Sequence, residues 1–161
     1  MELSVLTDSD WASDLVTRRS TSGGVLKLGK HILNQWCRLQ GSVSLSSGEA
    51  ELNSLIKGSS ECIGVCNLLN EMLDVHFHCL GYCDSSAARG IANRTGVGKV
   101  KHLSVKHMWI QEQTADKRLT VRWIPRKDNC SDALTHPLTG PALDKVLEDL
   151  DCWRPKPAPG T

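Results

Sequence analysis

The chain has 161 residues, with 19 lysines and arginines against 18 aspartates and glutamates, so its net charge of +1 favours neither an acidic nor a basic partner. No apolar run approaches the roughly 18 residues of a membrane-spanning helix, and no basic segment leads into an apolar one at the N-terminus. We therefore expect a single domain with no membrane association, located inside the cell, in the cytoplasm or the nucleus.

The first half of the chain predicts a small antiparallel sheet followed by a long helix. Three short apolar or alternating runs, Leu3–Leu6, Gly24–Leu28 and Ile32–Gln40, are separated by serine, glycine and lysine, which is typical of a three-stranded meander. From residue 48 to residue 73 the apolar positions follow helical spacing, which indicates one long amphipathic helix.

The second half alternates strands with helices. We expect strands at His78–Asp84 and Leu119–Ile124, and helices at 85–93, at 103–116, and from 131 to 150 with a break near Pro137. The proline-rich residues 153–161 are expected to be a disordered tail after a domain of residues 1–152. Strands linked through helices are usually parallel, and strands linked by hairpins are antiparallel. The order therefore predicts an α/β fold with a mixed five-stranded sheet, three antiparallel and two parallel strands, flanked by helices.

Cysteine and tryptophan are expected mainly in the interior. The seven cysteines are odd in number, and none has the spacing of a thiol-redox or zinc motif, which predicts reduced, buried thiols. Trp11, Trp36, Trp109 and Trp123 are expected to be core residues rather than platforms on which nucleic-acid bases stack.

Acidic residues occur where the predicted elements begin or end. Asp8 and Asp84 each lie at the end of a predicted strand, and ligands gather at the carboxyl ends of central parallel strands. Glu49 and Glu51 lie in the first turn of the long helix, and Asp132 begins the helix after the last strand. At 100° per residue, Glu51 falls roughly 60° from the centre of the apolar stripe and Glu49 roughly 100° from it. Glu51 is therefore the glutamate at the edge of the core.

Taken singly, each of these acids has an ordinary explanation as a turn residue or as a partner of a helix dipole. Several carboxylates in one cleft, however, repel one another unless cations neutralise them, and such oxygen ligands select magnesium or manganese. Two such ions about 3.5–4 Å apart can activate a water and stabilise a departing oxygen. The residues alone therefore predict a metal-dependent phosphoryl-transfer site.

Seven short motifs follow one another along roughly residues 4–140: DSDWASD, RRSTSGG, LSSGEAEL, YCDSSA, KVKHLSVKH, VRWIP and CSDALTHPL. In order and spacing they resemble the ribonuclease H domain of copia-type retrotransposon polyproteins. The resemblance implies a ribonuclease H-like fold and hydrolysis of the RNA strand of an RNA–DNA hybrid. It also implies that Asp8, Glu51, Asp84 and Asp132 hold two Mg²⁺ or Mn²⁺ ions, and that a reverse transcriptase domain of the same polyprotein is a partner.

Three further residues are reserve candidates for the site. Motif and helical phase both favour Glu51 over Glu49. Glu49 and Asp10 are therefore reserve candidates after the four main acids. Many cellular ribonucleases H have a histidine in the loop before the final aspartate, and the corresponding loop, residues 125–131, has none. His136 follows four residues after that aspartate, but the next residue is a proline that disrupts the local helix, which favours a capping or surface role.

A local basic region follows the fourth predicted strand. No acidic residue occurs from residue 85 through residue 111, and the candidates there for binding nucleic acid are Arg94, Lys99, Lys101, His102 and Lys106. This distribution favours a phosphate-binding track, and a solvated helix surface is the alternative.

Arg18 and Arg19 in the first hairpin are further candidates for contacts with the nucleic-acid backbone. The leading hypothesis is a divalent-metal-dependent ribonuclease H. A catalytically silent nucleic-acid-binding module with the same fold and a different nuclease of the ribonuclease H fold are the alternatives.

Overall fold

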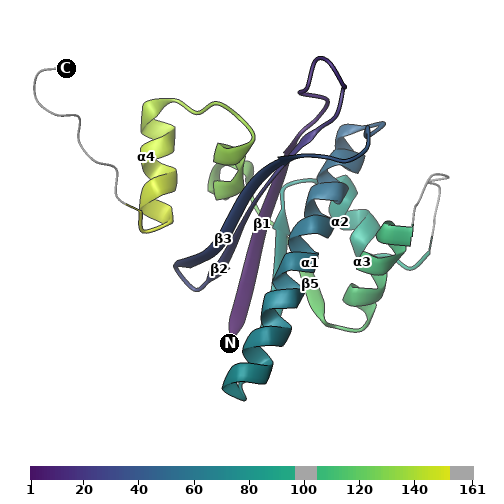
Figure 1. The fold of residues 1–161 in the computed structure, drawn as a ribbon, viewed down its shortest axis with the longest axis vertical. Helices are drawn as coiled ribbons and strands as arrows, with labels where there is room; N and C mark the ends of the chain where they lie inside the picture. Colours follow the sequence, from purple (N-terminus) through teal and green to yellow (C-terminus); the bar gives the residue numbers. More distant parts are fainter. Residues whose placement is uncertain (97–104, 153–161) are drawn as a thin grey trace, which may run out of the picture.

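The protein is described by a computed structural model that covers residues 1–96 and 105–152. Within these residues five strands form one mixed sheet in the order β3-β2-β1-β4-β5 (Figure 1). The strands are β1 (Glu2–Asp10), β2 (Thr21–Leu28), β3 (His31–Leu39), β4 (His78–Cys83) and β5 (Leu119–Trp123). β1, β2 and β3 pair antiparallel, whereas β4 runs parallel to both β1 and β5. The predicted α/β fold and its mixed sheet are confirmed.

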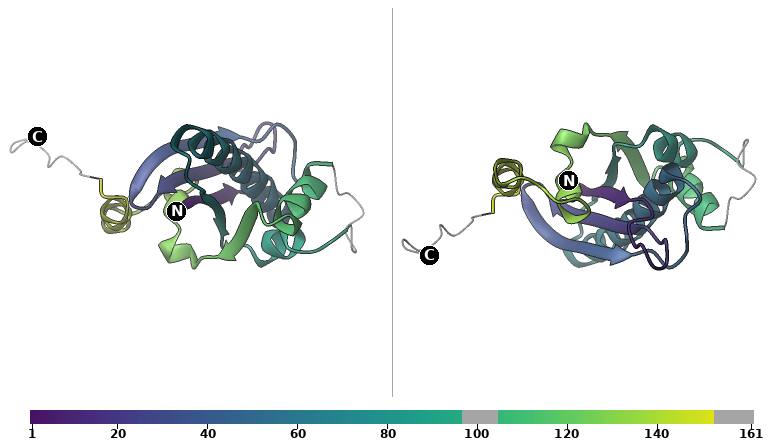
Figure 2. Two further views of the ribbon diagram at one scale, coloured as in Figure 1. Left: turned by 90° about the horizontal axis from the view of Figure 1, so that it is seen from below. Right: turned by 90° about the horizontal axis from the view of Figure 1, so that it is seen from above.

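The helices lie on both faces of the sheet. They are α1 (Ser47–Leu73), α2 (Ser86–Ala92), α3 (Val105–Ala115), the 3₁₀ helices η1 (Arg126–Asp128) and η2 (Cys130–Leu134), and α4 (Gly140–Asp149). Figure 2 shows α1 on one face and η2 on the other, with α2 and α3 beside α1. None of the helices in the described part of the chain is long and apolar enough to cross a membrane.

Alternating side chains of β1 and β2 supply both faces of the sheet with apolar surface. Val5 and Leu26 are buried against α1, whereas the neighbouring Leu6 and Val25 are buried on the opposite face with Cys130 of η2. This alternation has the period of two that a strand requires. It also places α1 and η2 on opposite sides of β1, and both contribute to the site below.

The secondary structure after β5 differs in one detail from the sequence-based expectation. The segment that begins at residue 131 was expected to be helical up to a break near Pro137, but its helical part is only the short 3₁₀ helix η2, which ends three residues before Pro137. A proline has no N–H and clashes with the preceding turn, so a longer helix is unfavourable there. Residues 97–104 and 153–161 lie outside the described part of the chain, and so do the expected start of the third helix at 103 and the expected tail.

The interior contains most, but not all, of the expected cysteines and tryptophans. All seven thiols are free, and five are buried, while Cys37 and Cys152 are exposed. Trp36 is buried and Trp109 packs against the core, but Trp11 and Trp123 are 49% and 54% exposed, so the prediction was wrong for these two. Trp11 lies in the loop after β1 and Trp123 ends the edge strand β5, where little of the sheet is left to cover a large ring.

Candidate metal centre

Four acidic side chains that are distant in the sequence reach one edge of the sheet. Asp8 lies near the end of β1 and Asp84 directly follows β4, and these are neighbouring parallel strands whose carboxyl ends meet. Glu51 lies near the N-terminus of α1, on one face of the sheet. Asp132 lies in η2, which packs on β1 and β2 from the other face. The edge of the sheet is thus approached by carboxylates from both sides.

Two buried side chains hold the end of β1 by binding its backbone. Ser54 of α1 donates its hydroxyl to the Asp8 carbonyl at 2.7 Å, and Asn129 donates its amide to the Thr7 carbonyl at 3.0 Å. The other end of the Asn129 amide accepts the Ser131 hydroxyl at 2.7 Å, which fixes the start of η2. Because fully satisfied buried networks are rigid, these bonds keep the Asp8 side chain between α1 and η2.

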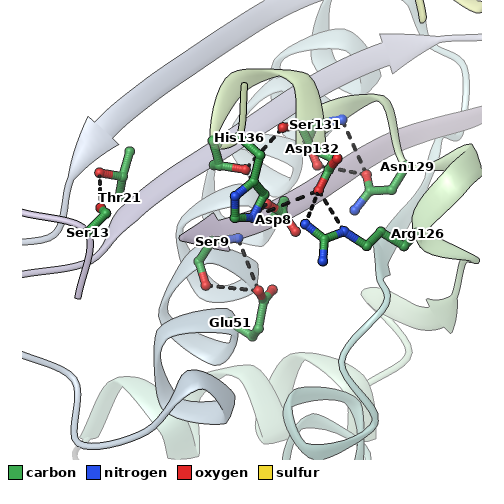
Figure 3. A network of polar contacts seen from close by, with 12 residues as sticks. Asp8, Ser9, Ser13, Thr21, Glu51, Arg126, Asn129, Ser131, Asp132 and His136 are labelled. Atoms are coloured by element: carbon green, nitrogen blue, oxygen red, sulfur yellow. Dashed lines mark hydrogen bonds and ion pairs between the residues drawn. The ribbon is translucent and has the colours of Figure 1, made fainter. Parts of the chain in front are cut away.

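Asp8, Glu51 and Asp84 form the first of two clusters that could hold a metal ion. One oxygen of each carboxylate lies within 4.8 Å of the others. Glu51 Oε1 accepts hydrogen bonds from the Ser9 N–H at 3.1 Å and the Ser9 hydroxyl at 2.9 Å (Figure 3). The second oxygen, Oε2, is buried and has no hydrogen-bond partner among the described residues. A buried carboxylate oxygen without a partner is unfavourable, and a bound cation would satisfy it. These residues therefore fit a divalent metal ion.

Asp8, Asp132 and His136 form the second cluster, again with one ligand atom of each within 4.8 Å of the others. The Nε2 atom of His136 lies 3.6 Å from Asp8 Oδ2 and 3.9 Å from Asp132 Oδ1. Thr135 donates its hydroxyl to the same Asp8 oxygen. Asp8 belongs to both clusters, so its carboxylate could contribute a ligand to either metal position.

Arg126 forms an ion pair with the Asp132 carboxylate of the second cluster. Its Nε and Nη2 atoms each lie 2.9 Å from Asp132 Oδ1 (Figure 3). The hydrogen bond and the charge of Asp132 raise the pKa of the arginine, which is 61% exposed at the rim of the site. A positive charge thus already lies beside Asp132.

Burial and the nearby negative charges raise the pKa values of Glu51 and Asp8. Burial raises the pKa of Glu51 to about 8, and the nearby charges of Asp8 and Asp84 add to this, while the Ser9 hydroxyl opposes it. The pKa of Asp8 is also raised, chiefly by burial, with the Thr135 hydrogen bond opposing. Such groups release their protons when a cation binds, because the cation then stabilises the charged form.

The structure brings together Asp8, Glu51, Asp84 and Asp132, and it adds His136, for which a capping or surface role had been favoured. The reserve acids lie outside both clusters. Asp10 is the last residue of β1, opposite Thr21 on β2. Glu49 accepts the N–H of Leu45 at 2.8 Å and so serves the N-terminus of α1.

Sequence reasoning did not identify Ser9, Thr135 or Arg126 as part of the site. Ser9 and Thr135 lie within the motifs that also contain Asp8 and Asp132, so proximity in a motif was the only signal. Arg126 lies six residues before its aspartate partner, in a different 3₁₀ helix, and no periodicity connects the two.

Among the candidate basic residues, Arg18 and Lys106 are exposed, and Arg94 is half-buried. The half-buried Arg19 donates its Nε to the Thr17 hydroxyl at 3.3 Å within the loop after β1. The other candidates, Lys99, Lys101 and His102, lie outside the described residues.

The fold is similar to that of solved ribonucleases H. LC11-RNase H1, isolated from compost by a metagenomic approach, aligns with a TM-score of 0.60 and 21% identity over 91% of this chain and 98% of the other. The N-terminal RNase H domain of Rv2228c from Mycobacterium tuberculosis was solved as a fusion with maltose-binding protein. It aligns with a TM-score of 0.58 and 18% identity over 91% of this chain and 96% of the other. A structure of LC11-RNase H1 in complex with an RNA/DNA hybrid aligns with a TM-score of 0.57 and 20% identity over 90% of this chain and 99% of the other. The chain therefore has a ribonuclease H-like fold.

Sequence comparison identifies the relatives. The chain is 30% identical to the retrovirus-related Pol polyproteins of transposons RE2 and RE1 from Arabidopsis thaliana, over 99% and 98% of its length. It is 31% identical over 80% of its length to that of transposon TNT 1-94 from Nicotiana tabacum. It spans 11%, 11% and 10% of these polyproteins, and no family model matches it. The chain is thus a ribonuclease H-like domain homologous to a segment of the Pol polyproteins of copia-type retrotransposons.

Proposed function

We propose that this domain is a divalent-metal-dependent endonuclease that hydrolyses the RNA strand of RNA–DNA hybrids. The observation that carries the proposal is the buried, unpartnered Oε2 of Glu51 beside Asp8 and Asp84. A buried carboxylate oxygen without a hydrogen-bond partner is better explained by cation binding than by a purely structural role. Homology to Pol polyproteins and the fold shared with a ribonuclease H solved on an RNA/DNA hybrid support the choice of substrate.

Asp8, Glu51, Asp84 and Asp132 would hold two Mg²⁺ or Mn²⁺ ions, and Asp8 belongs to both clusters. Bound in this way, the ions would supply an activated water and stabilise the departing oxygen. The chain's own residues orient the ligands. Ser9 fixes one oxygen of Glu51, Thr135 fixes one oxygen of Asp8, and the buried position of Asp8, 3% exposed, limits the access of bulk water to it.

We propose that basic side chains hold the hybrid. The proposed contacts are Arg18, Arg19, Arg94, Lys99, Lys101, His102 and Lys106. Phosphate contacts of this kind position a duplex without reading its sequence, which suits an enzyme that acts on hybrids of any sequence. A reverse transcriptase domain of the same polyprotein is the proposed protein partner, since the chain spans only a tenth of its relatives.

The test compares cleavage of labelled RNA–DNA hybrid, duplex DNA and duplex RNA in Mg²⁺ and in Mn²⁺. We expect cleavage of the hybrid RNA strand only, and a loss of at least about a hundredfold in Asp84→Asn, because an amide is a poor ligand for these ions. Asp74→Asn is the matched control, since Asp74 caps the far end of α1 with φ 50°, which asparagine tolerates.

Hybrid binding without cleavage in either metal would identify a silent binding module. Cleavage of duplex DNA would instead identify a different nuclease of the same fold. Full activity of a folded Asp84→Asn protein, checked by circular dichroism, would remove Asp84 from the site.

A further inference from the structure

The second cluster differs from the first in the kind of ligand atom that it offers. Asp8, Glu51 and Asp84 present oxygen only, whereas Asp8 and Asp132 share their cluster with an imidazole nitrogen of His136. We propose that His136 is a metal ligand and that the second position is therefore selective for Mn²⁺ over Mg²⁺. This inference rests on the metal binding of the proposed function and adds a ligand and an ion preference to it.

Local backbone structure directs His136 toward the carboxylates. Its N–H donates to the Asp132 carbonyl at 2.9 Å, so His136 lies one turn beyond the aspartate on the same side. Pro137 follows, and because a proline cannot continue the turn, the chain departs immediately afterwards. The His136 side chain is 28% exposed, which leaves it accessible from solvent but held against Asp8.

The distances favour an intervening ion over a direct bond. His136 Nε2 lies 3.6 Å from Asp8 Oδ2 and 3.9 Å from Asp132 Oδ1, and both are longer than the hydrogen-bond range of about 2.7–3.2 Å. An ion that binds at about 2.1 Å holds its donor atoms at most about 4.2 Å apart. The imidazole thus lies too far from the carboxylates to bond with them and near enough to share a cation.

The nitrogen ligand determines which ion this position prefers. Mg²⁺ requires oxygen ligands in near-ideal octahedral geometry and gives up its waters reluctantly. Mn²⁺ resembles Mg²⁺ in its preference for carboxylates, but as a first-row transition metal it accepts a nitrogen ligand more readily than Mg²⁺ does. We therefore expect the all-oxygen cluster to bind both ions and the cluster with His136 to bind Mn²⁺ more tightly.

The test measures binding, separately from cleavage. Mn²⁺ and Mg²⁺ are titrated into untagged protein by calorimetry, and pulsed electron paramagnetic resonance of the Mn²⁺ complex detects ¹⁴N coupling from a bound imidazole. We expect two Mn²⁺ ions and ¹⁴N coupling in the wild type. In His136→Gln we expect the coupling to disappear and one Mn²⁺ to bind about tenfold or more weakly. His31→Gln is the matched control, because His31 is exposed at the start of β3.

A second variant keeps the inference testable if His136→Gln is poorly folded. His136→Asp restores a carboxylate, so it should bind Mn²⁺ without ¹⁴N coupling and discriminate less between Mn²⁺ and Mg²⁺. Unchanged coupling in either folded variant, or its absence in the wild type, would overturn the proposal. Hybrid cleavage by a wild type without ¹⁴N coupling would leave the proposed function standing, whereas coupling without cleavage would leave only the His136 ligand standing.

Discussion

Glu49 and Glu51 lie two positions apart on α1, yet their carboxylates have different neighbours. Glu51 meets Ser9, Asp8 and Asp84 at the site, while Glu49 accepts the N–H of Leu45. We expect Glu51→Gln to reduce hybrid cleavage by about a hundredfold or more at saturating metal, because the neutral amide is a poor ligand. Glu49→Gln should retain activity and lose roughly 0.5–1 kcal/mol of stability as a weakened helix cap. Cleavage and thermal melting of the two variants are compared. A greater loss of cleavage in Glu49→Gln than in Glu51→Gln would contradict the position of α1 relative to the site.

The raised pKa of Glu51 makes the stability of the metal-free protein depend on pH. The ordinary pKa of a glutamate is 4.5, and burial raises the pKa of Glu51 to about 8 in the folded chain. Between these values the folded state binds a proton that the unfolded state has released, so stability is highest at low pH within this window and falls as pH rises. We expect the free energy of unfolding in EDTA to drop by roughly 1–3 kcal/mol from pH 5 to pH 8.

Glu51→Gln provides the comparison, because it removes the titrating group and retains the histidines. The pH dependence of its stability should be flatter, and the stabilisation by Mn²⁺ should grow more steeply with pH in the wild type than in the variant. Equal slopes of unfolding free energy against pH in the two proteins would show that Glu51 titrates near its ordinary value.

Arg126 would compete with a metal ion for one oxygen of Asp132. The guanidinium makes two contacts of 2.9 Å with Oδ1, so an ion must displace it or use the other oxygen while tolerating its charge. We expect Arg126→Gln to tighten Mn²⁺ binding several-fold, since the repulsion between two cations is removed. Calorimetric titration measures this, with the neighbouring Lys127→Gln as control. Weaker binding in Arg126→Gln would mean instead that the arginine holds Asp132 in the binding geometry.

At the scale of elements, the close approach of α1 to the sheet depends on Gly58. A Cβ atom at Gly58 would lie 2.4 Å from a methyl carbon of Thr7 and 3.1 Å from one of Val5, both on β1. Gly58→Ala should therefore push α1 from β1, destabilise the protein by about 1–3 kcal/mol and reduce cleavage. Gly64 on the same helix has no neighbour within 4 Å, so Gly64→Ala should stabilise by about 0.5–1 kcal/mol. Chemical denaturation of both variants tests the pair, and equal effects would contradict this account of the packing.

The predictable elements were those in which one periodicity dominates. The apolar alternation of β1, β2 and β5 and the helical stripe of α1 predicted both the sheet and the position of Glu51 at the edge of the core. Where long-range contacts decide, sequence reasoning failed. Trp11 is large and apolar, but it follows β1 into a loop, where its indole N–H donates to the Ser44 carbonyl at 3.0 Å.

The residues of the site also divide into those that a local pattern could place and those that long-range contacts place. Asp8 and Asp84 could be placed together because parallel strands bring their ends to one edge. The contacts of His136 and Arg126 depend on how the segment after β5 turns back across β1, and no local pattern specifies this path. Their positions therefore required the folded structure.

At the scale of the whole molecule, the basic residues proposed to contact the hybrid should make its binding sensitive to salt. We expect neutralisation of Lys101 and Lys106 together to reduce the slope of log affinity against log salt by up to about 1.4–1.8, because each phosphate contact contributes roughly 0.7–0.9. Ca²⁺ in place of Mg²⁺ suppresses hydrolysis during the titrations. Neutralising Lys30 and Lys117, in the turns that precede β3 and β5, is the control and should leave the slope unchanged. Equal slopes in all three proteins would show that the hybrid lies elsewhere.

The bond from the Asn129 amide to the Thr7 carbonyl joins residues 122 positions apart, and the hydroxyl of Thr135 reaches back 127 positions to Asp8. The first ligand of the site is therefore translated long before the segment that completes it. A nascent chain that ends before residue 132 has the sheet edge and three of the acids, but it lacks both Asp132 and His136. During synthesis the domain consequently passes through a period in which its five strands are made and only the cluster of Asp8, Glu51 and Asp84 can assemble, because the second cluster needs residues 132 and 136.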